Sequence, residues 1–569
     1  MLKVFRWIGA VFGGIMLLFW IVAIASLFIK PSVEDNSIVT ITLDGDIPEQ
    51  PVADLANFFE GRSPQSFVDI TEGIRAAATD PKINGLVLNV RSPHLGVAQI
   101  QEFEEALAVF RSSGKWNAAF LETAGEFSAG DGALALAVCA DEVILAPSGD
   151  VTLAGFRSEV PFVKGTLEML DIEAHVEKRQ DYKSAANMFT EDRFTPEHLL
   201  ALKGVVDDLQ ATLSAHIAKR RNVDITQVRQ WIRLSPLSAE QALDAKIVDK
   251  TAYWDAVLTK AEQLNHRDDS LLDIGVYNDR RKHPTAKTKI ALITGAGEIV
   301  RGSSEASFNA TTMGSNTITE AFRNARQAKV AGVLFRIDSP GGSYIASDLI
   351  RREVQLTREA GIPVVASMGN VAASGGYYVA MNADRIIAQP GSITGSIGIL
   401  AIHFSLRKAL KRWLGVTFDV YATHPNAFVL SALDPMDETQ KERFAKMVDR
   451  IYLDFTSKAA KDRDMPLEEL DAAAQGRVWS GTAAHDNKLI DELGGFQLAL
   501  KHLREIAKLA PQEQIELVPF PEEKQGLDML LDLLTVSAKQ SSIPWGQVLR
   551  SLGLTTNHGL LSLPYTPAL

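Results

Sequence analysis

An internal duplication constrains the fold of this chain more than any other feature of its sequence. Three blocks in the first half of the chain match three blocks in the second half, in the same order: residues 37–47 with 289–299, 69–93 with 317–340, and 139–149 with 382–392. In the last pair, CADEVILAPSG matches NADRIIAQPGS. Chance similarity does not keep order and spacing in this way. A chain with such a repeat is expected to hold two domains of one fold.

Each repeat alternates short apolar runs with stretches of helical spacing. In the second repeat, residues 332–337 form a run of β-forming residues that ends in a turn. Residues 347–359 then place apolar side chains at helical spacing, and residues 363–368 form the next apolar run. Strands that alternate with helices predict a largely parallel sheet with crossover helices. We therefore predict an α/β protein with two tandem repeats, over residues 36–275 and 285–569.

The two copies differ at two short motifs. The second repeat carries Ser-Pro-Gly-Gly and Ala-Ser-Gly-Gly, whereas the first carries Ser-Pro-His-Leu and Gly-Asp-Gly-Ala at the same places. In this alignment Asp131 stands where the second repeat has Ser374, and His94 stands where it has Gly341. A purely structural role should have kept both motifs in both copies. Their joint presence in one copy indicates a chemical role in the second repeat.

Ser374 follows a predicted strand and precedes an apolar run, residues 375–381, that we interpret as a helix. A serine at such a turn exposes its hydroxyl beside the N–H groups that start the helix. The N–H groups of Gly375 and Gly342, with Gly341 as a further donor, would then hold a developing oxyanion. Two N–H groups and a hydroxyl make an acyl-transfer site. The structural alternative is that the serine caps the helix and the glycines pack closely.

The residues themselves do not identify the base that would activate Ser374. A Ser-His-Asp site needs a histidine near the serine. His403, His424 and His485 lie in the same repeat, but none of them sits in a stretch with a chemical signature.

The N-terminus carries a long apolar stretch. Residues 8–29 contain no charge and are long enough to cross a bilayer core at about 1.5 Å per residue. Lys3 and Arg6 precede the stretch, so the positive-inside rule places residues 1–7 in the cytoplasm and the bulk of the chain on the other side. The rival interpretation is a signal peptide cleaved near Ala25. Because the apolar stretch continues beyond that point, we predict a retained transmembrane helix.

Composition excludes several classes of function. A net charge of −12 argues against nucleic acid as a partner. The single cysteine, Cys139, cannot form an intrachain disulfide. No Cys/His cluster has metal-ligand spacing, and no glycine-rich phosphate loop is present. We therefore expect no metal, no cofactor and no nucleotide.

Three motifs of the second repeat resemble those of signal peptide peptidase A, a family of membrane-anchored bacterial serine proteases: RIDSPGG, ASGGYY and TGSIGI. The anchor, the tandem repeat and the length resemble the long form of that family. The resemblance implies the fold of the Clp protease subunit and the crotonases, and a Ser–Lys dyad. Ser374 would be the nucleophile, and Lys183 of the first repeat, in QDYKSAANMF, would be the general base. Ser396 would orient the lysine, and the long form would be a homotetramer.

A lysine can act as a base only when it is neutral, and burial lowers its pKa from about 10.4 by disfavouring the ammonium. The resemblance further implies an enzyme of the bacterial inner (cytoplasmic) membrane, anchored by one span, with its catalytic bulk in the periplasm. Its substrates would be cleaved signal peptides and other short, apolar, unfolded peptides, degraded without ATP and bound in extended form.

Two other classes of function remain open at this point. A crotonase-like acyl-CoA enzyme would need neither a serine at position 374 nor a membrane anchor. A non-catalytic membrane scaffold on a protease fold predicts that the motifs have decayed in both repeats, whereas the second repeat keeps them.

Overall fold

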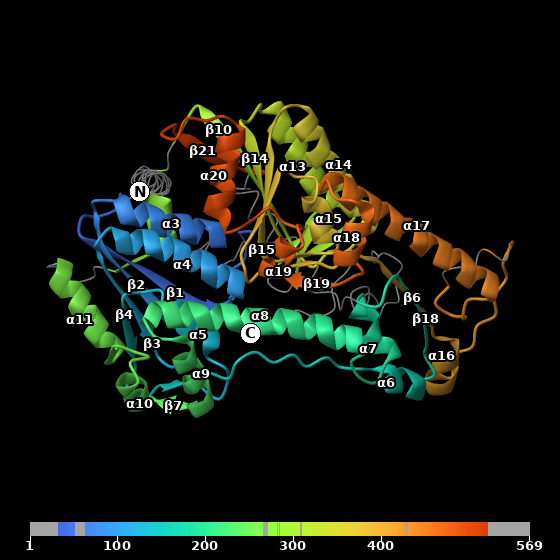
Figure 1. Ribbon diagram of the computed structural model, residues 1–569, viewed down its shortest axis with the longest axis horizontal. Coiled ribbons are helices and arrows are strands. Elements are labelled where there is room, and N and C mark those ends of the chain that lie inside the picture. Colours follow the sequence, from blue (N-terminus) through green and yellow to red (C-terminus); the bar gives the residue numbers. More distant parts are fainter. Residues whose placement is uncertain are drawn as a thin grey trace, which may run out of the picture.

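The computed structural model describes residues 32–51, 63–265, 271–281, 283, 285–307, 310–424, 426 and 431–521 (Figure 1). The predicted anchor, residues 8–29, lies outside the described residues, as does the stretch 522–569 at the end of the second repeat. Within the described part of the chain, no helix combines the length and the apolar character needed to cross a bilayer.

The first repeat builds a six-stranded sheet in which all neighbouring strands are parallel. Its order is β8-β4-β3-β2-β1-β9. The strands are β1 (Ser37–Gly45), β2 (Ile83–Pro93), β3 (Trp116–Leu121), β4 (Glu142–Leu145), β8 (Lys250–Thr251) and β9 (Leu271–Asp273). The central strand β2 is an apolar run that is buried over most of its length, as expected for a parallel sheet covered on both faces.

The second repeat builds an eight-stranded sheet of the order β19-β17-β15-β14-β10-β21, in which β16 also pairs with β15, and β20 with β16. Only β19 runs antiparallel to its neighbour. The strands are β10 (Thr288–Ala296), β14 (Gly332–Ser339), β15 (Val364–Ala373), β16 (Arg385–Ala388), β17 (Ile393–Gly395), β19 (Val478–Ser480), β20 (Glu492–Leu493) and β21 (Ile515–Phe520). The prediction of an α/β protein with largely parallel sheets is confirmed.

The two sheets repeat one topology. In the first repeat the strands β1, β2, β3 and β4 follow each other as β10, β14, β15 and β16 do in the second. Smaller details repeat as well. The antiparallel pair β5 (Asp150–Val151) and β7 (Leu237–Ser238) corresponds to the pair β17 and β19. The duplication seen in the sequence is therefore a duplication of structure.

Helices connect the strands and cover the sheets (Figure 1). Those of the first repeat are α3 (Phe67–Thr79), α4 (Val97–Ser112), α5 (Asp131–Ala137), α6 (Lys164–Met169), η1 (Ser184–Ala186), α7 (Asn187–Thr190), α8 (Pro196–Arg221), α9 (Ile225–Leu234), α10 (Ala239–Asp244), α11 (Trp254–Asn265) and α12 (Ile274–Arg280). Those of the second are α13 (Ser315–Gln327), α14 (Tyr344–Glu359), α15 (Gly375–Ala380), α16 (Arg407–Leu414), α17 (Glu438–Asp462), α18 (Leu467–Ala473), α19 (Gly481–Asp486) and α20 (Phe496–Ile506). Three short strands, β11 (Glu298–Val300), β12 (Ala306–Ser307) and β13 (Ala310–Gly314), form a small separate sheet.

The start of α14 illustrates how the sequence sets these boundaries. Apolar spacing predicted a helix over residues 347–359, and α14 begins three residues earlier, at Tyr344. The hydroxyl of Ser343 accepts the N–H of Ala346, which satisfies a donor that the first helical turn leaves free.

A two-stranded ladder joins the repeats at the far end of the molecule, at the right of Figure 1. Strand β6 (Glu173–Lys178) of the first repeat pairs antiparallel with β18 (Leu400–Ser405) of the second. The register places Lys178 opposite Leu400 and Glu173 opposite Ser405. This ladder carries a segment of the first repeat onto the second.

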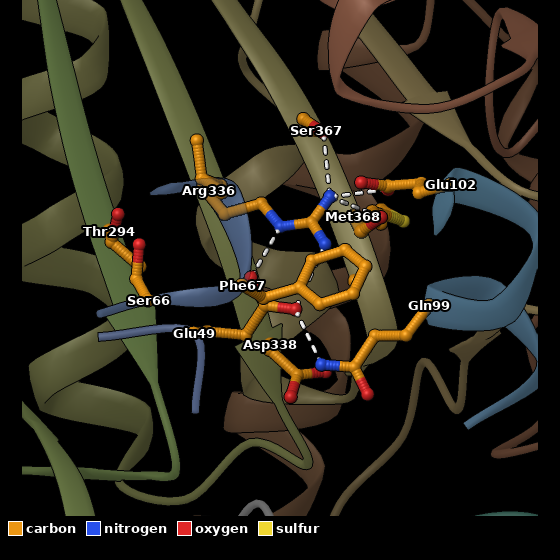
Figure 2. Close-up of polar contacts among 12 residues, drawn as sticks. Glu49, Ser66, Phe67, Gln99, Glu102, Thr294, Arg336, Asp338, Ser367 and Met368 are labelled. Carbon is orange, nitrogen blue, oxygen red and sulfur yellow. Dashed lines mark hydrogen bonds and ion pairs between the residues drawn. The ribbon is translucent and has the colours of Figure 1, made fainter. Parts of the chain in front are cut away.

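A buried ion network joins the repeats (Figure 2). Arg336 on β14 is fully buried, and its guanidinium binds both carboxylate oxygens of Glu49 at 2.9 Å and one oxygen of Glu102 on α4 at 2.6 Å. Because both glutamates belong to the first repeat, this cation ties the two repeats together. Removing one partner of such a buried network would leave an uncompensated charge, at a cost of about 3–5 kcal/mol.

Candidate active site

Ser374 lies at the turn between β15 and α15. Its backbone has φ 55° and ψ −113°, a conformation that a residue with a side chain adopts only where its surroundings impose it. The N–H of Ser374 donates to the carbonyl of Gly395 at 2.8 Å, which holds the turn against β17. The predicted helix after the serine is present as α15. The side chain of Ser374 is fully buried, so its hydroxyl depends on protein groups for its partners in this structure.

Lys183 reaches Ser374 from the first repeat. Beyond the end of β6, the N–H of Arg179 donates to the carbonyl of Ile399 at 3.1 Å, and its guanidinium binds Asp449 on α17 at 2.5 Å. The segment then turns inward, so that Lys183 is 1% exposed. The Nζ atom of Lys183 lies 3.0 Å from Oγ of Ser374. Both residues belong to the same chain.

Ser396 completes the surroundings of the amine. The Nζ atom of Lys183 lies 3.0 Å from both the carbonyl oxygen and the hydroxyl oxygen of Ser396. The hydroxyl of Ser396 donates in turn to the carbonyl of Gly476 at 3.4 Å, so its oxygen is left to accept from the amine. A neutral amine has two N–H donors and one lone pair. It can therefore donate twice to Ser396 and accept the hydroxyl proton of Ser374.

The electrostatics of the pocket favour that neutral amine. Burial lowers the pKa of Lys183 from 10.5 to about 7, because the ammonium loses its hydration. Lys458 on α17 shows the opposite behaviour: Asp348 and Asp454 bind its ammonium and raise its pKa above the ordinary value, although burial opposes them. None of the described carboxylates bonds to Lys183, which explains the difference.

The predicted oxyanion donors lie beside Ser374. A Cβ atom added to Gly375 would stand 3.1 Å from the backbone nitrogen of Gly342, so these two residues are in direct contact. Among the described residues, no acceptor takes the N–H of either glycine. The N–H of Gly341 is already in use, because it donates to Oγ of Ser339 at 3.2 Å. The geometry therefore favours Gly342 and Gly375 as the free pair.

Gly342 must be a glycine for two reasons. Its φ of +148° disfavours any side chain, and a Cβ atom would stand 2.2 Å from the carbonyl oxygen of Ile299 on β11. The backbone of Ile299 brackets the turn: its N–H donates to Gly341 at 2.7 Å, and its carbonyl accepts from Ser343 at 2.7 Å. This close approach fixes the direction of the Gly342 peptide.

Comparison with known proteins identifies the family. The model of peptidase family S49 matches residues 123–267 and 357–510, one stretch in each repeat. The chain belongs to peptidase family S49. It is a serine protease. It is 30% identical to the chloroplastic serine protease SPPA of Arabidopsis thaliana, over 90% of this chain and 76% of that protein. It is also 32% identical to Protease 4 of Salmonella typhi, over 83% of this chain and 77% of that protein.

Similarity to solved structures is weak. A mutant of ClpP1 from Listeria monocytogenes aligns with 37% of this chain and 94% of its own, at 13% identity and a TM-score of 0.24. A score this low supports no conclusion about the fold. The likeness to Clp protease and the crotonases therefore stays a prediction from the family motifs.

The first repeat of this S49 protease has a filled pocket where the second has its serine. Asp131 stands at the start of α5, as Ser374 precedes α15. Its carboxylate accepts the N–H of Ala154 at 2.9 Å and the N–H of Gly155 at 3.1 Å. These bonds tie the carboxylate to the segment that corresponds to residues 397 and 398 in the second repeat. The position has thus become a structural one.

Sequence reasoning missed one segment of the site, the stretch 474–479 that leads into β19. Gly476 packs directly against Lys183, and the carbonyl of Arg477 accepts the N–H of Ser396 at 2.7 Å. A signal was available, because the second repeat reads GRVW where the first reads LSPL. The three histidines considered from the sequence take no part: none of them bonds to Ser374 among the described residues, and His403 instead binds the carbonyl of Ser431 at 2.9 Å.

Proposed function

We propose that Ser374 is the nucleophile and Lys183 the general base of an acyl-enzyme protease. The observation that carries this proposal is the 3.0 Å contact between Lys183 Nζ and Ser374 Oγ in a buried pocket without a bonded carboxylate. As Oγ attacks the peptide carbonyl carbon, its proton passes to Nζ. The resulting ammonium keeps its two acceptors on Ser396, which orients it.

The remaining steps follow from the same groups. The oxygen of the tetrahedral intermediate receives the N–H groups of Gly342 and Gly375, which face no acceptor among the described residues. When the C–N bond breaks, the ammonium of Lys183 returns the proton to the leaving amine. Water then attacks the ester on Ser374, with Lys183 again as the base, and the free enzyme is restored.

In this assignment each repeat supplies different catalytic groups. The first repeat, residues 36–275, supplies the general base, while the second, residues 285–569, supplies the nucleophile and the oxyanion donors. The site forms where the β6–β18 ladder brings the two repeats together.

The substrates we propose are signal peptides already cleaved from their proteins, together with other short, apolar, unfolded peptides. Two features support this. The family motifs RIDSPGG, ASGGYY and TGSIGI are complete. The apolar stretch of residues 8–29 would keep the enzyme at the bacterial inner membrane, with its catalytic bulk in the periplasm, where such peptides accumulate.

We further propose that the chain assembles head to tail into a homotetramer. The duplication supports this, because residues 417–422 correspond to β6 and residues 157–162 correspond to β18. Neither segment belongs to a described helix or strand, and Tyr421 is 91% exposed. Pairing residues 417–422 of one copy with 157–162 of the next would repeat the β6–β18 ladder between chains and close a ring.

Peptide hydrolysis by three purified full-length proteins tests the catalytic assignment: wild type, Ser374→Ala and Lys183→Ala. We expect both variants to lose at least about a thousandfold in kcat, because each removes a member of the dyad. The wild-type kcat/KM should rise through about pH 7 and then level off, since the neutral amine is the active form.

Activity of Ser374→Ala above about a tenth of wild type would rule out this serine as the nucleophile. A crotonase-like acyl-CoA enzyme or a scaffold would show no peptide hydrolysis in any of the three proteins. Only the former would turn over an acyl-CoA, and it would keep that activity in Ser374→Ala.

A further inference from the structure

The segment 474–479 lies between residues 394–398 and the segment of the first repeat that carries Lys183. On one side it follows residues 394–398: β19 pairs antiparallel with β17, and the N–H of Gly476 donates to the carbonyl of Ile397 at 2.8 Å. On the other side it meets the lysine segment of the first repeat. A Cβ atom added to Gly476 would stand 2.6 Å from Cβ and 2.7 Å from the backbone nitrogen of Lys183. The backbones of Gly476 and Lys183 are therefore in contact at the point where the lysine side chain begins.

Arg477 adds a side-chain contact to this backbone contact. Its guanidinium carbon lies 4.0 Å from the ring centre of Trp479 and 5.2 Å from that of Tyr182, the residue before Lys183. Its Nε atom is buried and has no hydrogen-bond partner among the described residues, so stacking rather than polar contact holds it there. A cation over an aromatic face is attracted by the ring, and the attraction grows as water is removed.

The first repeat lacks the stacked cation and the glycine of this arrangement. The register of the pair β5–β7 places Leu237 opposite Val151, as Trp479 stands opposite Thr394 in the pair β17–β19. Counting back from these positions, Leu234 and Ser235 replace Gly476 and Arg477. The Ser235 hydroxyl accepts the N–H of Leu153 at 2.6 Å, where the second repeat uses the Arg477 carbonyl. Both copies therefore supply an acceptor for this backbone N–H, but only the second repeat, which has Ser374, also has the stacked cation.

We infer that Arg477 is a positioning residue for Lys183, acting as a clamp in which its guanidinium lies over the rings of both Tyr182 and Trp479. The inference rests on the proposed role of Lys183 as the base. The clamp fixes the main chain one residue before the lysine, which keeps the amine between Ser374 and Ser396. Loosening this segment is expected to let water reach the amine and so to stabilise the ammonium.

Charged and titratable groups around the pocket are few enough for a clean test. Those on the packed elements include Arg477 itself, the exposed Asp181 of the lysine segment, Asp208 on α8, which accepts from Ser480 Oγ at 2.5 Å, and Tyr452 on α17, which donates to Asp471 at 2.7 Å. None of them bonds to Nζ of Lys183 among the described residues. A change in the pH profile of a clamp variant therefore reports on hydration of the amine.

The experiment compares kcat and KM against pH for wild type, Arg477→Met, Tyr182→Leu and Tyr182→Phe. Arg477→Met keeps an unbranched apolar stem and removes the cation, while Tyr182→Leu removes the ring. Tyr182→Phe keeps the ring and is the matched control. We expect the first two variants to raise the midpoint of the kcat/KM profile by about one pH unit. Since only about a tenth of the amine would then be neutral at pH 7 instead of about half, kcat/KM at pH 7 should fall about fivefold and recover near pH 9.

The Tyr182→Phe profile should match wild type. A midpoint that stays in place in folded Arg477→Met and Tyr182→Leu would overturn the inference, as would a Tyr182→Phe midpoint that moves as far as that of Tyr182→Leu. If Arg477→Met does not fold, the two Tyr182 variants decide. Lys183→Ala separates this result from the proposed function: activity in that variant refutes the base itself, whereas an inactive Lys183→Ala with unmoved clamp midpoints refutes only the clamp.

Discussion

Replacing Lys183 by methionine should abolish catalysis and stabilise the protein at neutral pH. Methionine has a similar length, fits an apolar pocket and carries no charge. The pKa of Lys183 is about 7 in the folded protein and 10.5 without burial. By linkage, this difference makes the buried lysine cost about 4 kcal/mol of folding free energy at pH 7. Loss of the contacts to Ser374 and Ser396 offsets about 2–3 kcal/mol. We therefore expect Lys183→Met to be about 1–2 kcal/mol more stable than wild type at pH 7.

The sign of the pH dependence sharpens this prediction. Between pH 7 and pH 10.5 the unfolded chain binds a proton at this lysine that the folded chain does not, so wild-type stability rises with pH. The methionine variant lacks this contribution, and its advantage should shrink by about 2 kcal/mol between pH 7 and pH 9. Equilibrium unfolding in urea at both pH values measures the difference, because contributions of other groups cancel between the two proteins.

Lys461→Met, at an exposed position on α17, is the matched control for the replacement itself. A difference between Lys183→Met and wild type that does not change from pH 7 to pH 9 would refute the reasoning, because it would mean that the folded protein keeps the lysine charged.

Three further predictions concern the glycine donors, the first repeat and the origin of the dyad. Gly342→Ala should lower kcat at least about a hundredfold, since a Cβ atom meets the Ile299 carbonyl at 2.2 Å and shifts an oxyanion donor. Gly361→Ala, at a positive-φ glycine with nothing within 4 Å, should keep its activity, and equal losses in both variants would refute the donor role. Asp131→Ala should leave peptide hydrolysis nearly unchanged but lower the melting temperature, because two backbone N–H groups lose their acceptor. A loss of activity in the folded variant would contradict this and would mean that Asp131 takes part in catalysis. Co-expressed Ser374→Ala and Lys183→Ala chains should stay inactive in mixed oligomers, because Lys183 meets Ser374 within one chain; recovered hydrolysis would show that neighbouring chains share the site.

The sequence predicted the architecture and the place of Ser374 between a strand and a helix, because both depend on local patterns. Alternating apolar runs and helical spacing are properties of a few consecutive residues, and α15 and β14 appear where those patterns indicated them. Comparison of the two copies singled out Ser374 without any structure. The helix start at Tyr344 was missed by three residues, because a serine cap extends a helix beyond its apolar spacing.

Contacts between the repeats could not be predicted in the same way. Lys183 has no local sequence signal for burial, and from its composition alone it would be taken as an exposed lysine; the family resemblance pointed to it, and it is 1% exposed. Arg336 lies in an apolar strand run, yet its two partners, Glu49 and Glu102, are more than two hundred residues away in the chain. Pairing of this kind depends on how two folded units dock, and short-range patterns contain no information about docking.

The site exists only while the two repeats stay in contact, because each repeat supplies different groups to it. The second repeat has the serine and the free N–H groups, but Ala427 stands at its own position for the lysine. The first repeat has the lysine, but at its own position for the serine stands Asp131, whose carboxylate accepts two backbone N–H groups. If Ser374 and Lys183 act as we propose, neither repeat can carry out the reaction alone. The β6–β18 ladder and the Arg336 network hold the two halves in register, and the amine is kept neutral only while that contact excludes water. A substitution that loosens the contact without touching the dyad should thus appear first as an upward shift of the pH profile, before the fold itself is lost.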